Sequence, residues 1–179
     1  MKQQTTFEQN YKPQFSGHET FPLRYGWLEK AFDAVDSEGL NNQKIFADTS
    51  AIAHFGVGKN MVAAIRFWAQ VAGVIATEGK DVRATEFGKK LLRSDGLDPY
   101  LENPASLWRI HWEIASNPKH TSVFWLFNVF NESNFDRDLI LRQLSDFLAR
   151  NGWSKPTEKT LLNDINVLIS NYLPSSQKK

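Results

Sequence analysis

The sequence predicts a mainly α-helical protein in which a winged helix-turn-helix with a small β-hairpin wing precedes a second half made of helices. Two observations lead to this prediction. Residues 44–93 suggest the order helix, glycine turn, helix, hairpin, helix. From residue 104 on, apolar residues recur only at helical spacing. Because 41% of the 179 residues are apolar, the chain can bury a sizeable core in one large or two small domains.

The first ordered element is predicted to be a helix over about 22–36, where apolar residues repeat at helical spacing. Thr20 is expected to cap this helix and Pro22 suits its first turn. Residues 1–14 are polar and are expected to be flexible. We therefore place the winged-helix domain at 15–98.

A helix-turn-helix is predicted next. A short helix is expected at about 48–55, a tight turn at 55–58 and a longer helix at 59–72. The turn has the sequence Phe-Gly-Val-Gly, whose glycines permit a sharp change of direction. Gly73 is expected to end the second helix.

A hairpin and a capped helix follow. The segments 74–77 and 82–85 are short runs of residues that favour extended structure, and Glu78-Gly79-Lys80-Asp81 between them is typical of a hairpin turn. Thr85 is expected to cap a helix over 86–93.

The second half is predicted to be a helical domain over 99–174 with a flexible tail at 175–179. Its helices are expected at 104–116, 120–131, 136–150 and 157–172. The last two helices, with the turn between them, have the shape of a second helix-turn-helix, although no wing follows. Its candidate DNA-binding residues are Lys155, Lys159, Thr160 and Asn163. Asp164 is placed near the same outer face and argues mildly against this role.

The helix over 59–72 could read DNA, because a helical wheel separates its side chains into two faces. The buried face is predicted to contain Met61, Ile65, Trp68 and Ala72. The outer face holds Lys59, Arg66 and Gln70, with Asn60 on its flank. Arg can pair with guanine, and Asn and Gln can pair with adenine. In the predicted wing, Lys80 and Arg83 would contact phosphate or the minor groove.

Local charge supports this interpretation. Residues 56–93 contain seven Lys or Arg and three acids, whereas the formal net charge of the whole chain is only +1. Two alternatives stay open, because amphipathic helices with outward bases are common and winged helices also dock proteins. A neutral wing and a neutral recognition face would favour a protein scaffold.

The stretch from Phe15 to Tyr25 gathers His18, Glu19 and Arg24 just before a predicted helix. One hypothesis is an anion contact made by His18 and Arg24 with the helix N-terminus. The favoured alternative is a capping network in which these side chains bond nearby backbone. A nucleotide-related enzyme activity at these residues is the least favoured hypothesis, so we expect no catalytic residues.

Several functional classes lack their motifs. The chain has no cysteine, which excludes disulfides and thiolate chemistry and fits a reducing cytoplasm. His54, His111 and His120 have no ligand spacing with one another, and His18-Glu19 does not begin an HExxH motif. No P-loop or dinucleotide-binding motif is present. No secretory signal or membrane span is found. We therefore expect no metal, no cofactor and a cytoplasmic, nucleoid-associated protein.

The motifs FSGHETFPLRYGWLEKA, FGVGKNMVAAIRFWA, ATEFGKKLL, DPYLENPASLWRIHW and TLLNDI occur in this order. They resemble the bacterial domain of unknown function four-thousand-and-seven family, which is similar to helix-turn-helix proteins. The resemblance implies an association with DNA phosphorothioate modification and defence gene clusters that also encode a sulfurtransferase. Members continue beyond the motif at Tyr172 to Pro174, so we expect this chain to correspond to their N-terminal portion.

Together, these features predict an accessory or regulatory protein of a phosphorothioation or phage-defence system. It would contact double-stranded DNA through the helix 59–72 and the wing 78–84. The alternative is a non-catalytic scaffold that docks a sulfurtransferase or another defence-system protein through the helical half.

Overall fold

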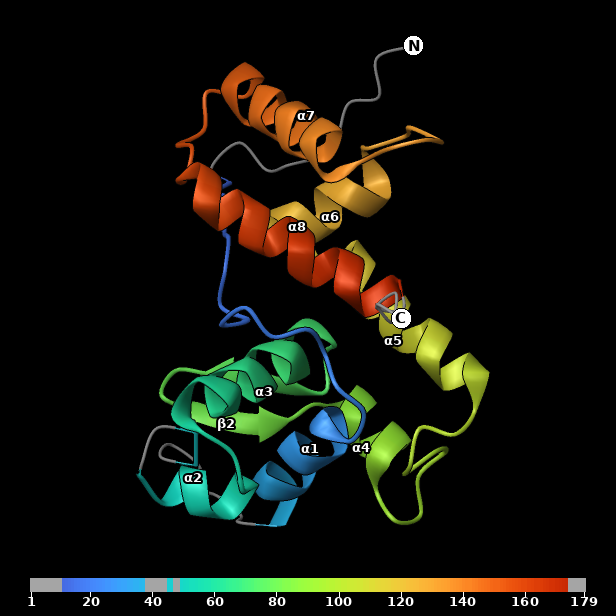
Figure 1. Cartoon of the computed structure of the whole chain (residues 1–179). Helices are drawn as coiled ribbons and strands as arrows, with labels where there is room; N and C mark the ends of the chain where they lie inside the picture. Colours follow the sequence, from blue (N-terminus) through green and yellow to red (C-terminus); the bar gives the residue numbers. More distant parts are fainter. Residues whose placement is uncertain (1–10, 38–44, 47–48, 174–179) are drawn as a thin grey trace, which may run out of the picture. The chain divides into compact units, whose positions relative to one another are not determined.

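The computed structural model describes residues 11–37, 45–46 and 49–173 and is mainly helical with a small two-stranded antiparallel sheet (Figure 1). The chain divides into two compact units. We call Gly17–Ile114 the hairpin unit, and Met1–Ser16 with Ala115–Lys179 the helical unit. The hairpin unit extends past residue 98, where the sequence analysis ended the first domain. One reason is that the guanidinium of Arg109 lies 5.3 Å from the ring centre of Phe87.

The hairpin unit is built around two packed helices, α1 and α3, and the sheet. Its elements are α1 Trp27–Ser37, α2 Thr49–Phe55, α3 Lys59–Val71, β1 Ile75–Glu78, β2 Asp81–Ala84, α4 Glu86–Leu92 and the first part of α5 Pro104–Ser116. Phe32 of α1 and both Ile65 and Trp68 of α3 are almost fully buried. Burial of such side chains contributes about 1.5–3 kcal/mol each, so this packing holds α3 in place.

The start of α1 differs from the prediction. The helix begins at Trp27, and Thr20 is not its N-cap. Thr20 has a φ of 64°, whereas an N-cap residue is typically extended. Ser16 and Glu19 also have positive φ, at 63° and 49°. The chain therefore makes a tight, left-handed path before α1, and local sequence preferences do not reveal it.

The elements predicted between residues 48 and 93 are present within one or two residues, although Asp48 itself lies outside the described residues. Gly56 and Gly73 have φ of 65° and 69°, which explains the turn before α3 and the end of α3. In the sheet, Glu78 pairs with Asp81 across the turn. The Thr85 hydroxyl accepts a bond of 2.9 Å from the N–H of Gly88, so the predicted cap of α4 is confirmed.

Gly88 is required where α4 passes β1. A methyl group at this position would collide with the carbonyl oxygen of Val74. That oxygen cannot move freely, because it accepts a bond of 3.0 Å from the N–H of Thr85.

We expect Gly88→Ala to lower the free energy of unfolding by about 1–3 kcal/mol, the usual cost of overpacking. At a helical position without a close neighbour, Gly→Ala instead raises the free energy of unfolding, by up to about 1 kcal/mol. Chemical denaturation measures the difference, with Lys90→Ala on the exposed side of α4 as the control. Equal or greater stability of Gly88→Ala would contradict the close approach.

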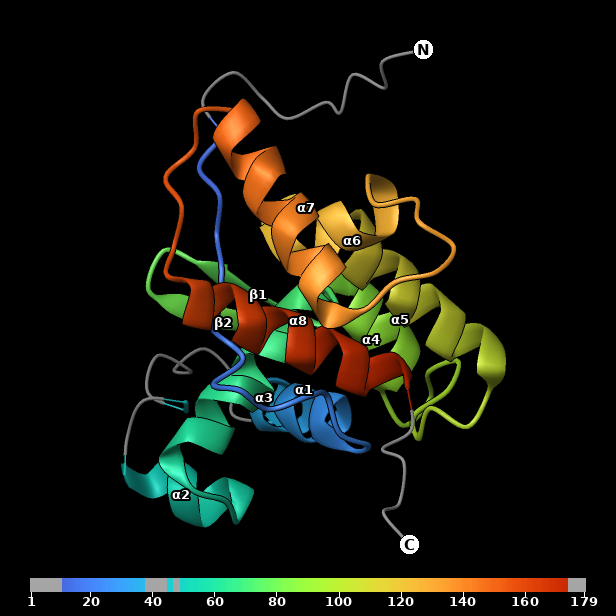
Figure 2. The ribbon, with the colours of Figure 1, turned by 45° about the horizontal axis from the view of Figure 1, so that its top comes forward.

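The helical unit contains α6 Thr121–Asn128, α7 Arg137–Arg150 and α8 Glu158–Tyr172. Helices α7 and α8 pack side by side, as both views show (Figure 2). The buried cluster between them and α6 consists of Trp125, Ile140, Leu144, Phe147, Leu148, Leu161 and Ile165. The side chains of Asp136 and Thr157 cap α7 and α8, close to the predicted starts. Helix α6 ends at Asn128, earlier than the predicted residue 131.

The segment 11–16 is bonded to the helical unit. The hydroxyl of Tyr11 donates to the carbonyl of Pro118 at 2.6 Å. Gln14 and Thr121 exchange bonds, with the N–H of Gln14 donating to the threonine hydroxyl at 2.8 Å. Residues 11–14 thus have bonding partners that the sequence did not reveal, whereas residues 1–10 lie outside the described part.

The position predicted for Asp164, near an outer face of its helix, was also wrong. The residue is only 4% exposed. Its carboxylate accepts a bond of 2.6 Å from the Ser122 hydroxyl and one of 3.0 Å from the N–H of Ser16. Asp164 therefore joins α8 to α6 and to the segment 11–16.

Within the described residues, no helix has the length and apolar character needed to cross a membrane.

Candidate functional site

Helix α3 has one fully buried face and one polar face. The buried residues are Val62, Ala64, Ile65, Trp68, Ala69 and Val71. Ala64 and Val71 widen this face beyond the prediction, and Met61 is only half-buried. On the polar face, Lys59 and Asn60 are exposed at the N-terminal end, and Arg66 and Gln70 are half-buried further along. Helix α3 contains no acidic residue.

Two of the predicted DNA contacts meet at the hairpin. The amide of Gln70 donates to the Thr77 hydroxyl at 2.6 Å, and the guanidinium of Arg66 approaches the same oxygen at 3.5 Å. The guanidinium also lies 5.9 Å from the ring centre of Phe46. An arginine has five N–H donors, so Arg66 can be held in this way and still bind a ligand. The structure thus brings the end of α3 and strand β1 together as one polar surface.

The hairpin itself carries no net charge. Arg83 lies between two acids, 3.5 Å from the Glu78 carboxylate and 3.9 Å from that of Asp81. Lys80 is exposed at the turn beside Gly79. Two acids and two bases therefore cancel formally on the hairpin. The basic excess detected in the sequence is located on α3 and α4 instead.

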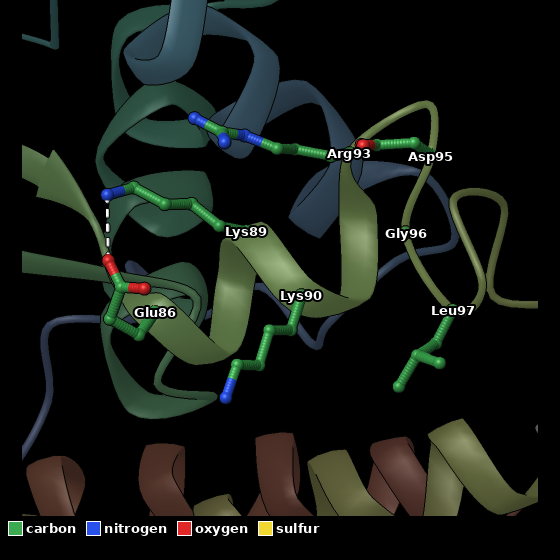
Figure 3. A pocket seen from close by; sticks show the side chains of 7 residues that line it. All are labelled: Glu86, Lys89, Lys90, Arg93, Asp95, Gly96 and Leu97. Atoms are coloured by element: carbon green, nitrogen blue, oxygen red, sulfur yellow. Dashed lines mark hydrogen bonds and ion pairs between the residues drawn. The ribbon is translucent and has the colours of Figure 1, made fainter.

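Helix α4 lines a shallow hollow of about 410 Å³ (Figure 3). Lys89 bonds Glu86 at 2.8 Å, and Arg93 bonds the Asp36 carboxylate at 3.1 Å. These contacts lower the pKa of Glu86, mainly through the hydrogen bond from Lys89, and raise the pKa of Arg93, mainly through its bond to Asp36. Lys90 points away from the other two bases (Figure 3). Most of the charge on α4 is therefore already compensated.

The two residues of the predicted anion contact, His18 and Arg24, each interact with a different part of the protein. His18 is 5% exposed, accepts a bond from the N–H of Thr20 at 3.1 Å and lies edge-on to the ring of Phe67 at 5.7 Å. The guanidinium of Arg24 lies 5.5 Å from the ring centre of Trp27. The bond from the N–H of Thr20 to His18 fits the part of the favoured alternative in which His18 bonds nearby backbone, whereas Thr20 does not cap α1 as that alternative also required.

The candidate residues of the second helix-turn-helix lie at the start of α8. Lys155 and Lys159 are exposed. Thr160 is half-buried and bonds the capping residue Thr157 through its N–H at 3.2 Å. Asn163 is also half-buried. This surface has two bases beside Glu158, so its net charge is small.

Comparisons with known proteins give one family and two solved structures. Residues 15–179 match the family described as protein of unknown function DUF4007. A magnesium-bound crystal structure of SspB has a TM-score of 0.80 and 29% identity, covering 93% of this chain and 51% of that chain. A second crystal structure of SspB has a TM-score of 0.79 and 28% identity over 90% of this chain and 50% of that one. This chain thus spans about half the length of those proteins. No curated protein gives a significant match.

The magnesium ion of the first relative prompts a test of the residues in this chain. Within the described residues, no group of three or more histidines and carboxylates gathers as a metal site. The two buried carboxylates are already used. Asp98 accepts bonds from the N–H groups of Glu102 and Asn103 at 3.0 and 2.9 Å, and Asp164 is held as described above. The described residues therefore do not fit a multidentate magnesium site.

The family model matches residues 15–179, which is most of the chain, and this shows that the chain belongs to the DUF4007 family.

Proposed function

We propose that the hairpin unit is a winged helix-turn-helix module that binds double-stranded DNA. In this proposal α3 enters the major groove and the β1–β2 hairpin is the wing. The observation that carries it is the polar face of α3, which has two bases, an asparagine, a glutamine and no acid, opposite a face that is buried. A rigidly held helix of this kind is what readout of base edges requires.

The structure changes how much each predicted residue is expected to contribute to DNA binding. Lys59 and Asn60 are exposed at the end of α3 that a recognition helix points at DNA. Arg66 and Gln70 would contact bases or phosphate from positions fixed by Thr77. Arg83 would contribute less, because two carboxylates already neutralise it.

We further propose that the protein serves a DNA phosphorothioate modification or defence system as an accessory or regulatory component that binds rather than catalyses. Membership of the DUF4007 family and similarity to SspB structures support this context. The second candidate is a scaffold that docks a sulfurtransferase of the same system. The neutral hairpin favours this scaffold, because a DNA-binding wing is usually basic. The polar face of α3, which carries two bases and no acid, favours DNA binding over the scaffold.

Duplex binding by the purified chain tests the first proposal. Fluorescence anisotropy would be measured with duplexes that contain or lack phosphorothioate, at two salt concentrations. We expect binding that weakens with salt, with a slope of about 0.9 in log units for each phosphate contact. No binding at low salt, together with co-purification of the chain with a sulfurtransferase of the same gene cluster, would favour the scaffold.

The pairing of Arg83 gives a prediction specific to the wing. Glu78→Gln removes one negative charge and leaves Arg83 with only the more distant Asp81. We expect duplex affinity to rise roughly threefold to tenfold, because the wing then carries a net positive charge toward the phosphates. Glu132→Gln in the helical unit is the control and should leave affinity unchanged. Equal affinity of the Glu78 variant and the parent would show that the hairpin does not approach DNA.

A further inference from the structure

An apolar pocket of about 200 Å³ lies within the hairpin unit. Its walls come from the segment that leads into α1 and from the region around the start of α5. The apolar lining residues are Leu23, Leu28, Leu101, Leu107 and Ile110. Pockets for cofactors and drug-sized ligands are larger, about 300–1,000 Å³, so this volume suits one large apolar side chain.

Large side chains around the pocket are exposed to solvent. Tyr25 is 78% exposed, Tyr100 62% and Leu107 52%. Tyr25 and Leu107 also line the pocket, so these residues and the cavity form one surface. Single exposed apolar residues are ordinary, but exposed aromatic residues at the edge of an apolar cavity, here Tyr25 and the Tyr100 to which it bonds, are typical of protein interfaces. We call this surface the aromatic pocket.

The aromatic pocket is held rigid by hydrogen bonds. The Tyr25 hydroxyl donates to the carbonyl of Tyr100 at 2.8 Å and so joins the two walls. Asp98 fixes the turn that carries Tyr100 by accepting two backbone bonds. A hydrogen bond from Ser106 is the main reason that the pKa of Asp98 is lowered. A surface that is already ordered loses little entropy when a partner binds.

Arg24 supplies a positive charge at the lip of the pocket. Its guanidinium faces the rings of Phe21 and Trp27 at 5.7 and 5.5 Å, and it makes no ion pair with any described residue. Such a cation can accept a carboxylate in a bidentate contact. The other base nearby, Arg109, is bonded to Glu113.

We propose that the aromatic pocket docks a segment of a partner protein that carries one large apolar side chain and, within a helical turn of it, a carboxylate. The apolar side chain fills the cavity between Leu23 and Ile110, and the carboxylate pairs with Arg24. The surface does not suit a nucleic acid strand, because Arg24 is its only uncompensated base and such strands need a basic track. This inference is independent of DNA binding by α3.

Selection from a displayed library of random peptides on the intact chain tests the proposal. We expect the enriched peptides to share a Leu, Phe or Trp with an Asp or Glu about three or four residues away. A synthetic peptide with that consensus should bind about tenfold or more weakly to Arg24→Gln and to Leu107→Ala, which changes an exposed lining residue, than to the parent. Arg24→Lys should retain part of the affinity, because it keeps the charge.

Two control variants change similar exposed side chains elsewhere. Lys30→Gln removes an exposed base from α1, and Leu97→Ala removes an exposed leucine that does not line the pocket. Both should bind the consensus peptide like the parent. The proposal is overturned if no such consensus is enriched or if the peptide binds the Arg24 and Leu107 variants like the parent. Competition by oligothymidine would assign the surface to nucleic acid instead.

Discussion

Replacing Lys59 and Arg66 together by alanine is expected to weaken duplex binding by about a hundredfold. Each charged contact with a base or phosphate contributes about 1–3 kcal/mol, and the two residues carry all the positive charge of α3. If both contact phosphates, the slope of log affinity against log salt should also become smaller by about two. Anisotropy titrations at several salt concentrations measure both quantities.

A matched double variant separates this effect from a general loss of charge. Lys30 and Lys119 are exposed outside α3, and their replacement by alanine removes the same formal charge. It should change affinity by less than about threefold. The α3 variant should stay folded, because Gln70 continues to bond Thr77. If both double variants bind alike, α3 does not read DNA and the scaffold becomes the better proposal.

The contrast between α3 and the hairpin explains why simple counting of bases was misleading. The sequence has seven bases between residues 56 and 93, but the fold places acids beside several of them. The pair of Lys89 with Glu86 could have been foreseen from its spacing along one helix. The bond between Arg93 and Asp36 could not, because the two residues are 57 positions apart.

Local signals predicted the part of the fold that contains the candidate site. Glycines with positive φ at 56, 73 and 79 mark turns, and the Thr85 cap marks the start of α4. The start of α1 escaped prediction, since Thr20 adopts a φ of 64° that a β-branched residue rarely does. The aromatic pocket escaped as well, because Tyr25 and Tyr100 meet only in the folded unit.

In the helical unit, the contacts of Asp164 likewise could not be predicted from the sequence, because they join residues far apart in the chain. Replacement of Asp164 should have a large effect on stability. The Ser122 hydroxyl is buried with its residue and donates to this carboxylate. The N–H of Ser16 donates to it as well. Asp164→Ala would leave both donors without an acceptor, at a cost of about 2–4 kcal/mol. The exposed Asp146→Ala on α7 should change stability by less than about 0.5 kcal/mol.

Hydrogen exchange would show which of the two units loses stability in Asp164→Ala. If Asp164 joins the segment 11–16 to the helical unit, amides of α6 and α8 should exchange faster in Asp164→Ala, whereas those of α3 should not change. The difference matters because the two units need not unfold together, and a single denaturation curve would average them. Faster exchange in α3 would mean that Asp164 stabilises both units, and the division at residues 16 and 115 would then not be an energetic one. Unchanged exchange in α8 would show that its buried carboxylate is dispensable.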